Sequence, residues 1–205
     1  TSAPGRSPPA HRKSRRSRFE TPASDRQRRT WIGTRAGLSI WNGEDFFNLT
    51  RENGLPSDNV TALLADDQGV WIGTSNGGLY QFVQNQLRVY NAGNAGLLSD
   101  TVTALARAAD GSLYVGSERG LARFEDGRAA RVEDLPAVPV RSLAADERGR
   151  IWVGTEGNGL YAYDGAAWQP VTAGLPSPTI AALFPDPYGA LWAGGENGGL
   201  MRLAE

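Results

Sequence analysis

The feature that most constrains the fold is a short motif that recurs five times at nearly constant spacing. Each copy begins with an aromatic residue, has a glycine two positions later and ends in a Gly-Leu pair, as in 71-WIGTSNGGL-79. The leading residues are Trp31, Trp71, Tyr114, Trp152 and Trp192, which lie 40, 43, 38 and 40 positions apart. A loop that cradles a phosphate occurs once per site, whereas a fixed period of this size indicates stacked or radial repeats.

Each repeat is expected to form four short antiparallel strands. In the second unit, β-prone segments cover 60–65, 70–74, 79–83 and 86–90, and turns rich in Gly, Asp and Asn separate them. No segment has the length and periodicity of a helix. The sequence therefore predicts an all-β fold, a β-propeller of four-stranded blades with about four and a half to five blades present. A parallel β-helix, a sandwich and helical repeats fit the period less well.

The first strand of each repeat supports this interpretation. It reads Val/Ile-x-small-Leu, and its third residue is Ala62, Ala104, Ser142 or Ala182. In a propeller the first strand lies nearest to the axis, where blades crowd and large side chains do not fit. The leading aromatic residues are expected to fill the wider space between neighbouring sheets. The glycine two positions after each of them is expected where another backbone or an aromatic ring comes close.

Residues 1–24 form an Arg-, Ser- and Pro-rich tail that is expected to be disordered, because it offers almost nothing apolar to bury. Three interpretations stay open: a gene-boundary or reading-frame artefact, which we favour, a plain linker, and a nucleic-acid-binding arm. We expect no nucleic-acid partner. The propeller repeats are expected to cover 25–205, with no clear first strand in the first blade. Asp25 lies six residues before Trp31, as Asp146 does before Trp152, so the first repeat can begin there.

Composition excludes several kinds of site. The chain has no cysteine and a single histidine, His11, which lies in the tail. Disulfides, thiol nucleophiles, His-based triads and multi-His metal sites are therefore ruled out. The Asp-Gly turns lack the spacing of a calcium loop, and turn chemistry explains them better. We expect no metal, no cofactor and no catalytic residues.

Candidate ligand-binding residues are expected at one rim of the propeller. Because strands alternate in direction, the turns after the second strands and the links into the first strands share a rim. Residues in these turns differ between blades while the framework repeats, and such a pattern suits ligand recognition by a rigid scaffold. The candidates are Arg35, Asn76, Glu118, Arg119, Glu156, Asn158, Glu196 and Asn197. Ordinary solvated turn residues are the alternative interpretation for each of them.

The linked motifs resemble the two-component regulator propeller repeat. Trp71 to Thr74, Gly77 to Tyr80 and Gly54 to Ser57 match it, and so do 152–155, 159–161 and 174–177. The resemblance covers roughly 25–205. It implies a sensor region, the extracytoplasmic part of a hybrid sensor kinase or a related regulator, and a ring that usually has seven blades. We therefore interpret the chain as a fragment of a larger propeller, with a closed five-bladed ring as the alternative.

The resemblance also implies a function, which is the binding of a ligand, such as an oligosaccharide or a protein, by a non-catalytic extracytoplasmic sensor. Further blades, a membrane helix and an output domain such as a histidine kinase would then lie elsewhere in a longer protein, and the membrane would be reached only through those parts. A protein-interaction scaffold uses the same rims and remains the alternative. A propeller lyase or glycosidase is less favoured, because it needs clustered His, metal ligands or facing carboxylates near the axis.

Overall fold

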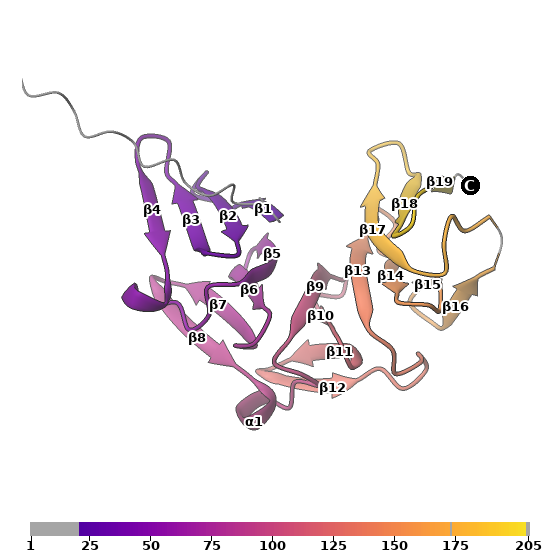
Figure 1. Cartoon of the computed structure of the whole chain (residues 1–205), viewed down its shortest axis with the longest axis horizontal. Coiled ribbons are helices and arrows are strands. Elements are labelled where there is room, and N and C mark those ends of the chain that lie inside the picture. The colour runs from indigo at the N-terminus through magenta and orange to yellow at the C-terminus, as the bar shows by residue number, and fades with distance from the viewer. Residues whose placement is uncertain (1–20, 173, 204–205) are drawn as a thin grey trace, which may run out of the picture.

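The computed structural model describes residues 21–172 and 174–203, which fold into five antiparallel sheets arranged as the blades of an open ring (Figure 1). Four sheets have four strands, and the fifth has three within the described residues. In each sheet the strands pair in chain order, with the first strand nearest to the axis and the last at the periphery. The predicted all-β propeller with four-stranded antiparallel blades is confirmed.

The strands of the five blades have the following bounds. Blade 1 comprises β1 (Thr21–Ser24), β2 (Thr30–Thr34), β3 (Gly37–Trp41) and β4 (Phe46–Leu49). Blade 2 comprises β5 (Val60–Asp66), β6 (Gly69–Thr74), β7 (Leu79–Val83) and β8 (Gln86–Tyr90). Blade 3 comprises β9 (Val102–Arg107), β10 (Leu113–Ser117), β11 (Gly120–Glu125) and β12 (Arg128–Arg131). Blade 4 comprises β13 (Val140–Ala145), β14 (Ile151–Thr155), β15 (Leu160–Tyr163) and β16 (Trp168–Val171). Blade 5 comprises β17 (Ile180–Pro185), β18 (Leu191–Gly195) and β19 (Leu200–Leu203).

Two single-turn helices interrupt the links between blades, and the sequence did not predict them. The 3-10 helix η1 (Arg51–Asn53) lies between blades 1 and 2, and α1 (Ala92–Ala95) lies between blades 2 and 3. Each begins after a residue with an extended backbone and ends at a glycine in the left-handed region. The Asn91 side chain caps α1 by accepting from the backbone N–H groups of Gly93 and Asn94. These turns are too short for a periodic pattern, so capping residues are their main sequence signal.

Strand β1 begins the first blade four residues before the boundary that the repeat pattern predicted at Asp25. It pairs antiparallel with β2, with Ser24 opposite Thr30. Its sequence lacks the Val-x-Ala-Leu pattern of the other first strands, so backbone pairing defines it. Pro22 is compatible with this position because β1 is an edge strand. The rest of the predicted tail, 1–20, lies outside the described residues.

Each blade packs an apolar face against the next blade along the chain. The leucine of the Gly-Leu pair is between 0% and 2% exposed in blades 1 to 4 and 66% exposed in blade 5. These residues are Leu38, Leu79, Leu121, Leu160 and Leu200, respectively. Phe184 in the inner strand of blade 5 is 61% exposed as well. Blades 1 and 5 stand at the two ends of the arc (Figure 1), so no described blade covers this face of blade 5.

The glycine after each leading aromatic residue makes room for the first strand of the next blade. A Cβ at Gly73 would lie 2.6 Å from Cγ1 of Val102. One at Gly154 would lie 2.6 Å from the carbonyl oxygen of Ile180 in the next blade and closer still to Oγ of Ser142 in its own blade. The expected close approach is confirmed, and the approaching residue is a Val or Ile rather than an aromatic ring. At Gly194 the nearest atom would be 3.7 Å away and belongs to the same blade. The repeat glycine is thus needed where a neighbouring blade is present.

Hydroxyl groups join the inner strands of successive blades. Thr61 donates to the carbonyl of Val102, Thr103 to that of Val140 and Ser142 to that of Ile180. The first strand is the inner edge of its blade, so its backbone has no sheet partner on the side that faces the axis. Each of these hydroxyls therefore gives a carbonyl of the next blade's first strand a hydrogen-bond donor. Polar contacts near the axis and apolar contacts farther out therefore hold the blades together.

A carboxylate fixes three of the leading tryptophans. The indole N–H groups of Trp31, Trp152 and Trp192 donate to Asp25, Asp146 and Asp186 at 2.8, 2.9 and 3.1 Å. These are the pairs separated by six residues, so Asp25 has the same role in blade 1 as Asp146 in blade 4 and Asp186 in blade 5, although the blade itself begins at Thr21. Arg28 stands where the other turns have a glycine, and it adopts φ 60°.

The carboxylate of Asp146 also binds Arg150, whose Nε lies 2.7 Å from Oδ2 and whose guanidinium lies over the Trp152 ring. Burial opposes ionisation of Asp146, but the hydrogen bonds from Trp152 and Arg150 and the Arg150 charge outweigh it and lower the pKa. The same balance lowers the pKa of Asp25. Both carboxylates are therefore expected to be ionised at neutral pH.

Asp146→Asn is expected to lower the free energy of unfolding at pH 7 by about 1–3 kcal/mol, because charge-assisted hydrogen bonds are lost. The pKa of the folded state lies below the ordinary value of 3.8, so this contribution is present above that value and is lost as pH falls through the folded pKa. The difference from the wild type should be full at pH 7 and should shrink below pH 3.8. Urea denaturation at a series of pH values measures it, with the exposed Asp45→Asn as the control. A difference that does not depend on pH would contradict this account.

Gly73→Ala is expected to lower the free energy of unfolding by about 1–3 kcal/mol, because the new methyl group would lie 2.6 Å from Cγ1 of Val102 in the next blade. Gly194→Ala places a methyl group at the equivalent position of blade 5, where no atom lies closer than 3.7 Å. It should change the free energy of unfolding by less than about 0.5 kcal/mol. Denaturation of the two variants measures the contrast. Equal losses would show that the glycine serves its own strand and not the neighbouring blade.

Candidate ligand-binding rim

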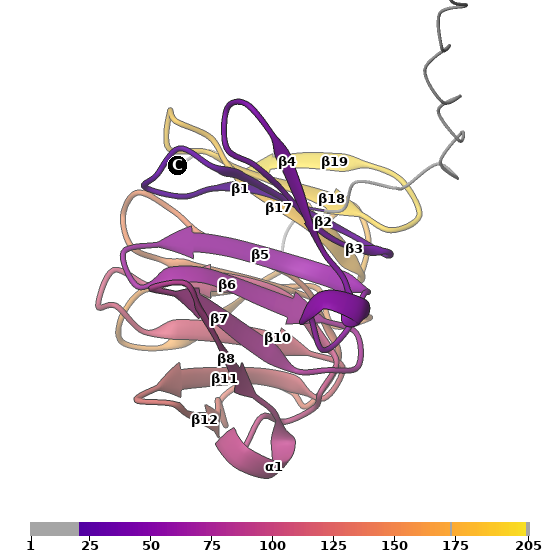
Figure 2. The ribbon, with the colours of Figure 1, turned by 90° about the vertical axis from the view of Figure 1, so that its left-hand side faces the viewer.

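The turns after the second strands and the links between blades lie together at one rim of the ring. Figure 2 shows from the side that the strands run between two rims. Backbone hydrogen bonds tie the turns of blades 1, 2, 4 and 5 to an adjacent link, which leads into the next blade for blade 1 and into the turn's own blade for the other three. Gly37 donates to Asp58, Ser75 to Asn59, Glu156 to Pro139 and Glu196 to Thr179. The rim is thus a continuous hydrogen-bonded surface and not a set of separate loops.

All eight predicted ligand-binding residues lie in these turns, and all eight are exposed. The turns belong to all five blades, so the candidates follow the arc of the rim. Arg35 lies between β2 and β3, Asn76 between β6 and β7, Glu118 and Arg119 between β10 and β11, Glu156 and Asn158 between β14 and β15, and Glu196 and Asn197 between β18 and β19.

Serines of the inter-blade links hold two of these side chains in place. The hydroxyl of Ser57 donates to Oδ1 of Asn76 at 2.5 Å, and that of Ser99 donates to Oε1 of Glu118 at 2.9 Å. Both serines are buried, so they orient the outer side chains from below. The remaining lone pairs and N–H groups of Asn76 and Glu118 can still meet a ligand.

A cavity of about 440 Å³ lies between the inner strands β5, β9, β13 and β17, and Arg141 lines it. Nη2 of Arg141 lies 2.9 Å from Oε2 of Glu156, so this ion pair connects the cavity with the rim. The two side chains are 42% and 43% exposed. A pair this exposed contributes less than about 1 kcal/mol, and a ligand can compete for either partner at little cost.

The framework beneath the rim includes a hydroxyl that the sequence analysis did not assign. The residue three positions after the leading aromatic donates its side-chain hydroxyl to the carbonyl of the glycine that closes the turn. These pairs are Thr34 with Gly37, Thr74 with Gly78, Ser117 with Gly120 and Thr155 with Gly159, at 2.8 to 3.0 Å. The recurrence of Thr or Ser at this position in four repeats is the sequence signal for these hydrogen bonds. Because the same bond holds each of these turns, the outer residues of the rim can vary while the turn keeps its shape.

One turn carries a further brace from a tyrosine. The Tyr80 hydroxyl donates to the carbonyl of Gly77, within the same turn as Asn76. Burial raises the pKa of Tyr80, so the hydroxyl remains a donor across the physiological range. A Cβ at Gly77 would overlap this hydroxyl oxygen, which accounts for the Gly-Gly sequence of the turn.

The opposite rim carries the Asp-Gly turns. Within the described ranges, no three His, Cys, Asp or Glu side chains are grouped so that they could hold a metal ion. The aspartates there instead accept hydrogen bonds within their own turns, as Asp146 does from the N–H groups of Arg148 and Arg150. These residues therefore serve the turns in the way that the sequence suggested.

These features define a propeller with a repeated internal framework and a variable polar rim. Residues 54–76 and 134–157 match the model of the two component regulator propeller. The predicted resemblance is confirmed at these two segments. A search of curated proteins by sequence gave no match.

Solved structures of similar shape are also propellers. The extracellular domain of a putative hybrid two component system from B. thetaiotaomicron superimposes with a TM-score of 0.76 at 20% identity, over 91% of this chain and 28% of that chain. Virginiamycin B lyase from Staphylococcus aureus gives 0.66 at 11% identity, over 89% and 68%. PorZ, a surface component of the type-IX secretion system of Porphyromonas gingivalis, gives 0.65 at 19%, over 91% and 32%. At these identities the likeness shows a shared fold.

The chain thus spans only about a quarter to a third of the signalling and secretion structures that it resembles. No helix in the described part of the chain is long and apolar enough to cross a membrane.

Proposed function

We propose that the chain is part of the extracytoplasmic sensor region of a two-component signalling protein, and that it binds its ligand at the rim without catalysing a reaction. The observation that carries this proposal is the combination of regulator-propeller repeats with a polar rim that varies on a constant framework. Hydroxyl braces and backbone bonds hold the framework, so the side chains of the rim are presented with little loss of freedom on binding.

An oligosaccharide is the ligand that we propose for the rim. The exposed carboxylates and amides, such as Glu156, Asn158 and Asn197, can accept and donate hydrogen bonds to sugar hydroxyls. The turns follow an arc across five blades, which suits an extended chain of sugar units. Because no single turn carries a concentrated charge, neutral hydroxyl-rich ligands fit it better than ions.

A larger ring and an output domain complete the proposed protein. The face of blade 5 that carries Leu200 and Phe184 corresponds to faces that the next blade buries elsewhere in this chain. A further blade is therefore the partner that we propose for it, within a ring of seven. A membrane helix and an output domain, such as a histidine kinase, would follow from the role of a transmembrane sensor.

Three considerations support a binding role over catalysis. The only histidine, His11, lies outside the described residues, and the chain has no cysteine. The inner strands present Ala, Leu, Thr and Ser to the axial cavity, together with Arg141. Its one charged residue, Arg141, is paired with Glu156. The likeness to a lyase rests on 11% identity and concerns the fold.

The proposal is tested by screening the purified chain on an array of plant, animal and microbial oligosaccharides and measuring the hits by calorimetry. Glu156→Gln and Asn158→Ala are expected to weaken binding about tenfold or more, since each removes hydrogen bonds of roughly 1.5 kcal/mol or more to the ligand. Glu147→Gln changes an exposed carboxylate of the same blade at the opposite rim and should leave the affinity unchanged.

The stability of Glu156→Gln provides the second control. It should stay within about 1 kcal/mol of the wild type, because the pair with Arg141 is half-exposed. A loss of binding with unchanged stability then reports on the ligand contact itself. Failure of every oligosaccharide to bind, or binding that no rim variant weakens, would contradict the proposed role of the rim.

A further inference from the structure

A cavity of about 500 Å³ lies between blades 2 and 3, at the rim opposite the candidate site. It is walled by strands β6 to β8 of blade 2 and by the ends of β9 and β11 with their turns in blade 3. Its volume falls within the roughly 300–1,000 Å³ of typical small-molecule sites. The proposed role of the other rim does not involve it.

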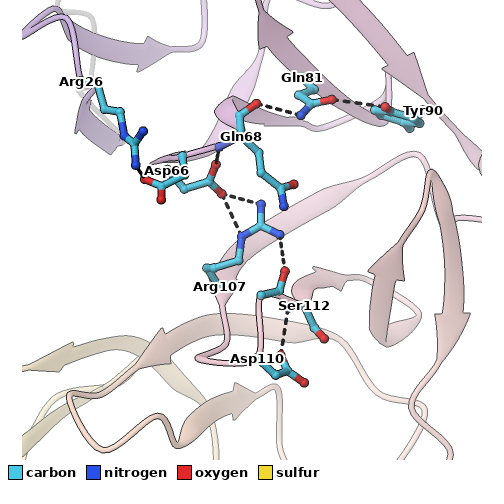
Figure 3. Close-up of polar contacts among 10 residues, drawn as sticks. Arg26, Asp66, Gln68, Gln81, Tyr90, Arg107, Asp110 and Ser112 are labelled. Carbon is cyan, nitrogen blue, oxygen red and sulfur yellow. Dashed lines mark hydrogen bonds and ion pairs between the residues drawn. The ribbon is translucent and has the colours of Figure 1, made fainter.

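Trp71, in the wall of this cavity, lacks the aspartate hydrogen bond that fixes Trp31, Trp152 and Trp192. Blade 2 has a shorter turn, with Asp66 directly opposite Gly69, so its aspartate precedes Trp71 by five residues instead of six. Asp66 turns to blade 3 and pairs with Arg107, as Figure 3 shows. Nε1 of Trp71 is left buried with no hydrogen-bond partner among the described residues.

An unsatisfied indole N–H in the wall of a cavity favours an occupant with an acceptor. Trp71 is 3% exposed, and leaving such a buried donor unpaired costs about 1–3 kcal/mol. In blades 1, 4 and 5 the chain avoids this cost with its own aspartate. In blade 2 a ligand oxygen can take the place of that carboxylate after a small adjustment of the wall.

Aromatic rings form the apolar part of the wall. Trp71, Tyr90 and Phe124 are in mutual contact, with ring centroids 4.9 to 6.0 Å apart. Trp71 and Phe124 are 3% and 4% exposed, and the Arg107 guanidinium lies over the Trp71 ring, so the half-buried Tyr90 is the ring that the C–H groups of a sugar can cover.

The polar part of the wall contains a series of hydrogen bonds that runs from the backbone carbonyl of Gln68 through the side-chain amide of Gln81 to the hydroxyl of Tyr90 (Figure 3). Nε2 of Gln81 donates to the carbonyl of Gln68 at 2.9 Å, and the Tyr90 hydroxyl lies 3.3 Å from Oε1 of Gln81. Gln81 is buried, so its amide is fixed in orientation and can offer its second N–H without further loss of freedom. Gln68 lines the same cavity, and its side chain extends toward Arg107 (Figure 3).

The charges around the cavity mostly neutralise one another. Arg107 is held by Asp66 and by the carbonyl of Gly111. Arg123 lies within ion-pair distance of both Asp110 and Glu125. Arg88 and Asp126, which form no ion pair within the described ranges, carry opposite charges. The named groups leave one net negative charge, which disfavours an anionic ligand and is too exposed to select strongly for a cationic one.

We propose that this cavity is a second binding site, which takes one ring of a neutral, polyhydroxylated ligand such as a hexopyranose. One hydroxyl accepts from the Trp71 indole, others exchange hydrogen bonds with Gln68, Gln81 and Arg88, and the ring lies against Tyr90 of the aromatic cluster. The interface between blades 4 and 5 cannot do this, because Asp146 already occupies the indole N–H of Trp152.

The test uses the whole chain with ¹⁵N-labelled tryptophan and the methyl glycosides of glucose, galactose, mannose and xylose as probes. At least one glycoside is expected to shift the Trp71 indole signal, which is assigned by its absence in Trp71→Phe, and to do so saturably. Glucuronate and glucosamine, which carry charge on a similar ring, should bind more weakly. Selective shifts with the charged sugars, or none with any glycoside, would overturn the proposal.

Variants separate the cavity from the rim. Trp71→Phe and Gln68→Ala should each weaken glycoside binding several-fold to tenfold, while Trp152→Phe and Gln169→Ala, which change blade 4, should not. Both Trp71→Phe and Trp152→Phe remove part of a buried ring and should lower the unfolding midpoint, but Trp152→Phe should lower it more, because only Trp152 also loses an indole hydrogen bond. Glycoside binding that is unaffected in Trp71→Phe but lost in Glu156→Gln would overturn the second site and support the rim.

Discussion

The structure depends on the contact between each blade and the first strand of the next. A leading aromatic residue and a leucine cover the neighbouring sheet, and the glycine between them lets a Val or Ile approach closely. Burying such a leucine stabilises the fold by roughly 1.5–3 kcal/mol, and the contact is repeated at four interfaces. Because the period of the sequence is the period of this contact, the fold follows from one unit and its neighbour.

Fixing the blades in this way leaves the two rims free for different tasks. At one rim, Thr and Ser hydroxyls brace turns whose outer residues vary, so polar groups can differ from blade to blade without disturbing the frame. At the other rim, aspartates satisfy the tryptophans that fill the interfaces. Blade 2 departs from this rule, and the departure coincides with the largest cavity described above. The absence of the aspartate–tryptophan hydrogen bond in blade 2 is therefore the main indication of a specialised site among the described residues.

Much of the fold could be predicted because the order of apolar, small and polar side chains repeats from blade to blade. The period, the four strands per blade, the small residues of the inner strand and the spacing of Asp25 from Trp31 are all confirmed. Strand β1 was missed because its residues carry no apolar pattern and pair only through the backbone. The helices η1 and α1 were missed because a single turn has no periodicity.

The candidate sites were less accessible to prediction. The sequence placed eight polar residues on one rim, and the structure brings all of them there, but it could not show that Ser57 and Ser99 hold two of them. The second cavity depends on a turn shortened by one residue and on an ion pair between Asp66 and Arg107, which are 41 positions apart. Partners so distant in sequence cannot be read from local spacing, although the missing aspartate before Trp71 was a visible signal.

Each blade of this fold is stabilised by the next one, which covers its apolar face. Hydrogen–deuterium exchange of the backbone amides tests this most directly, because it reports the free energy of local opening. Strands β14 and β18 are each paired on both sides, and β14 in the covered blade 4 should exchange much more slowly than β18 in blade 5, where Leu200 is exposed. Equal protection in blades 4 and 5 would contradict the claim, because it would show that a blade does not need its neighbour.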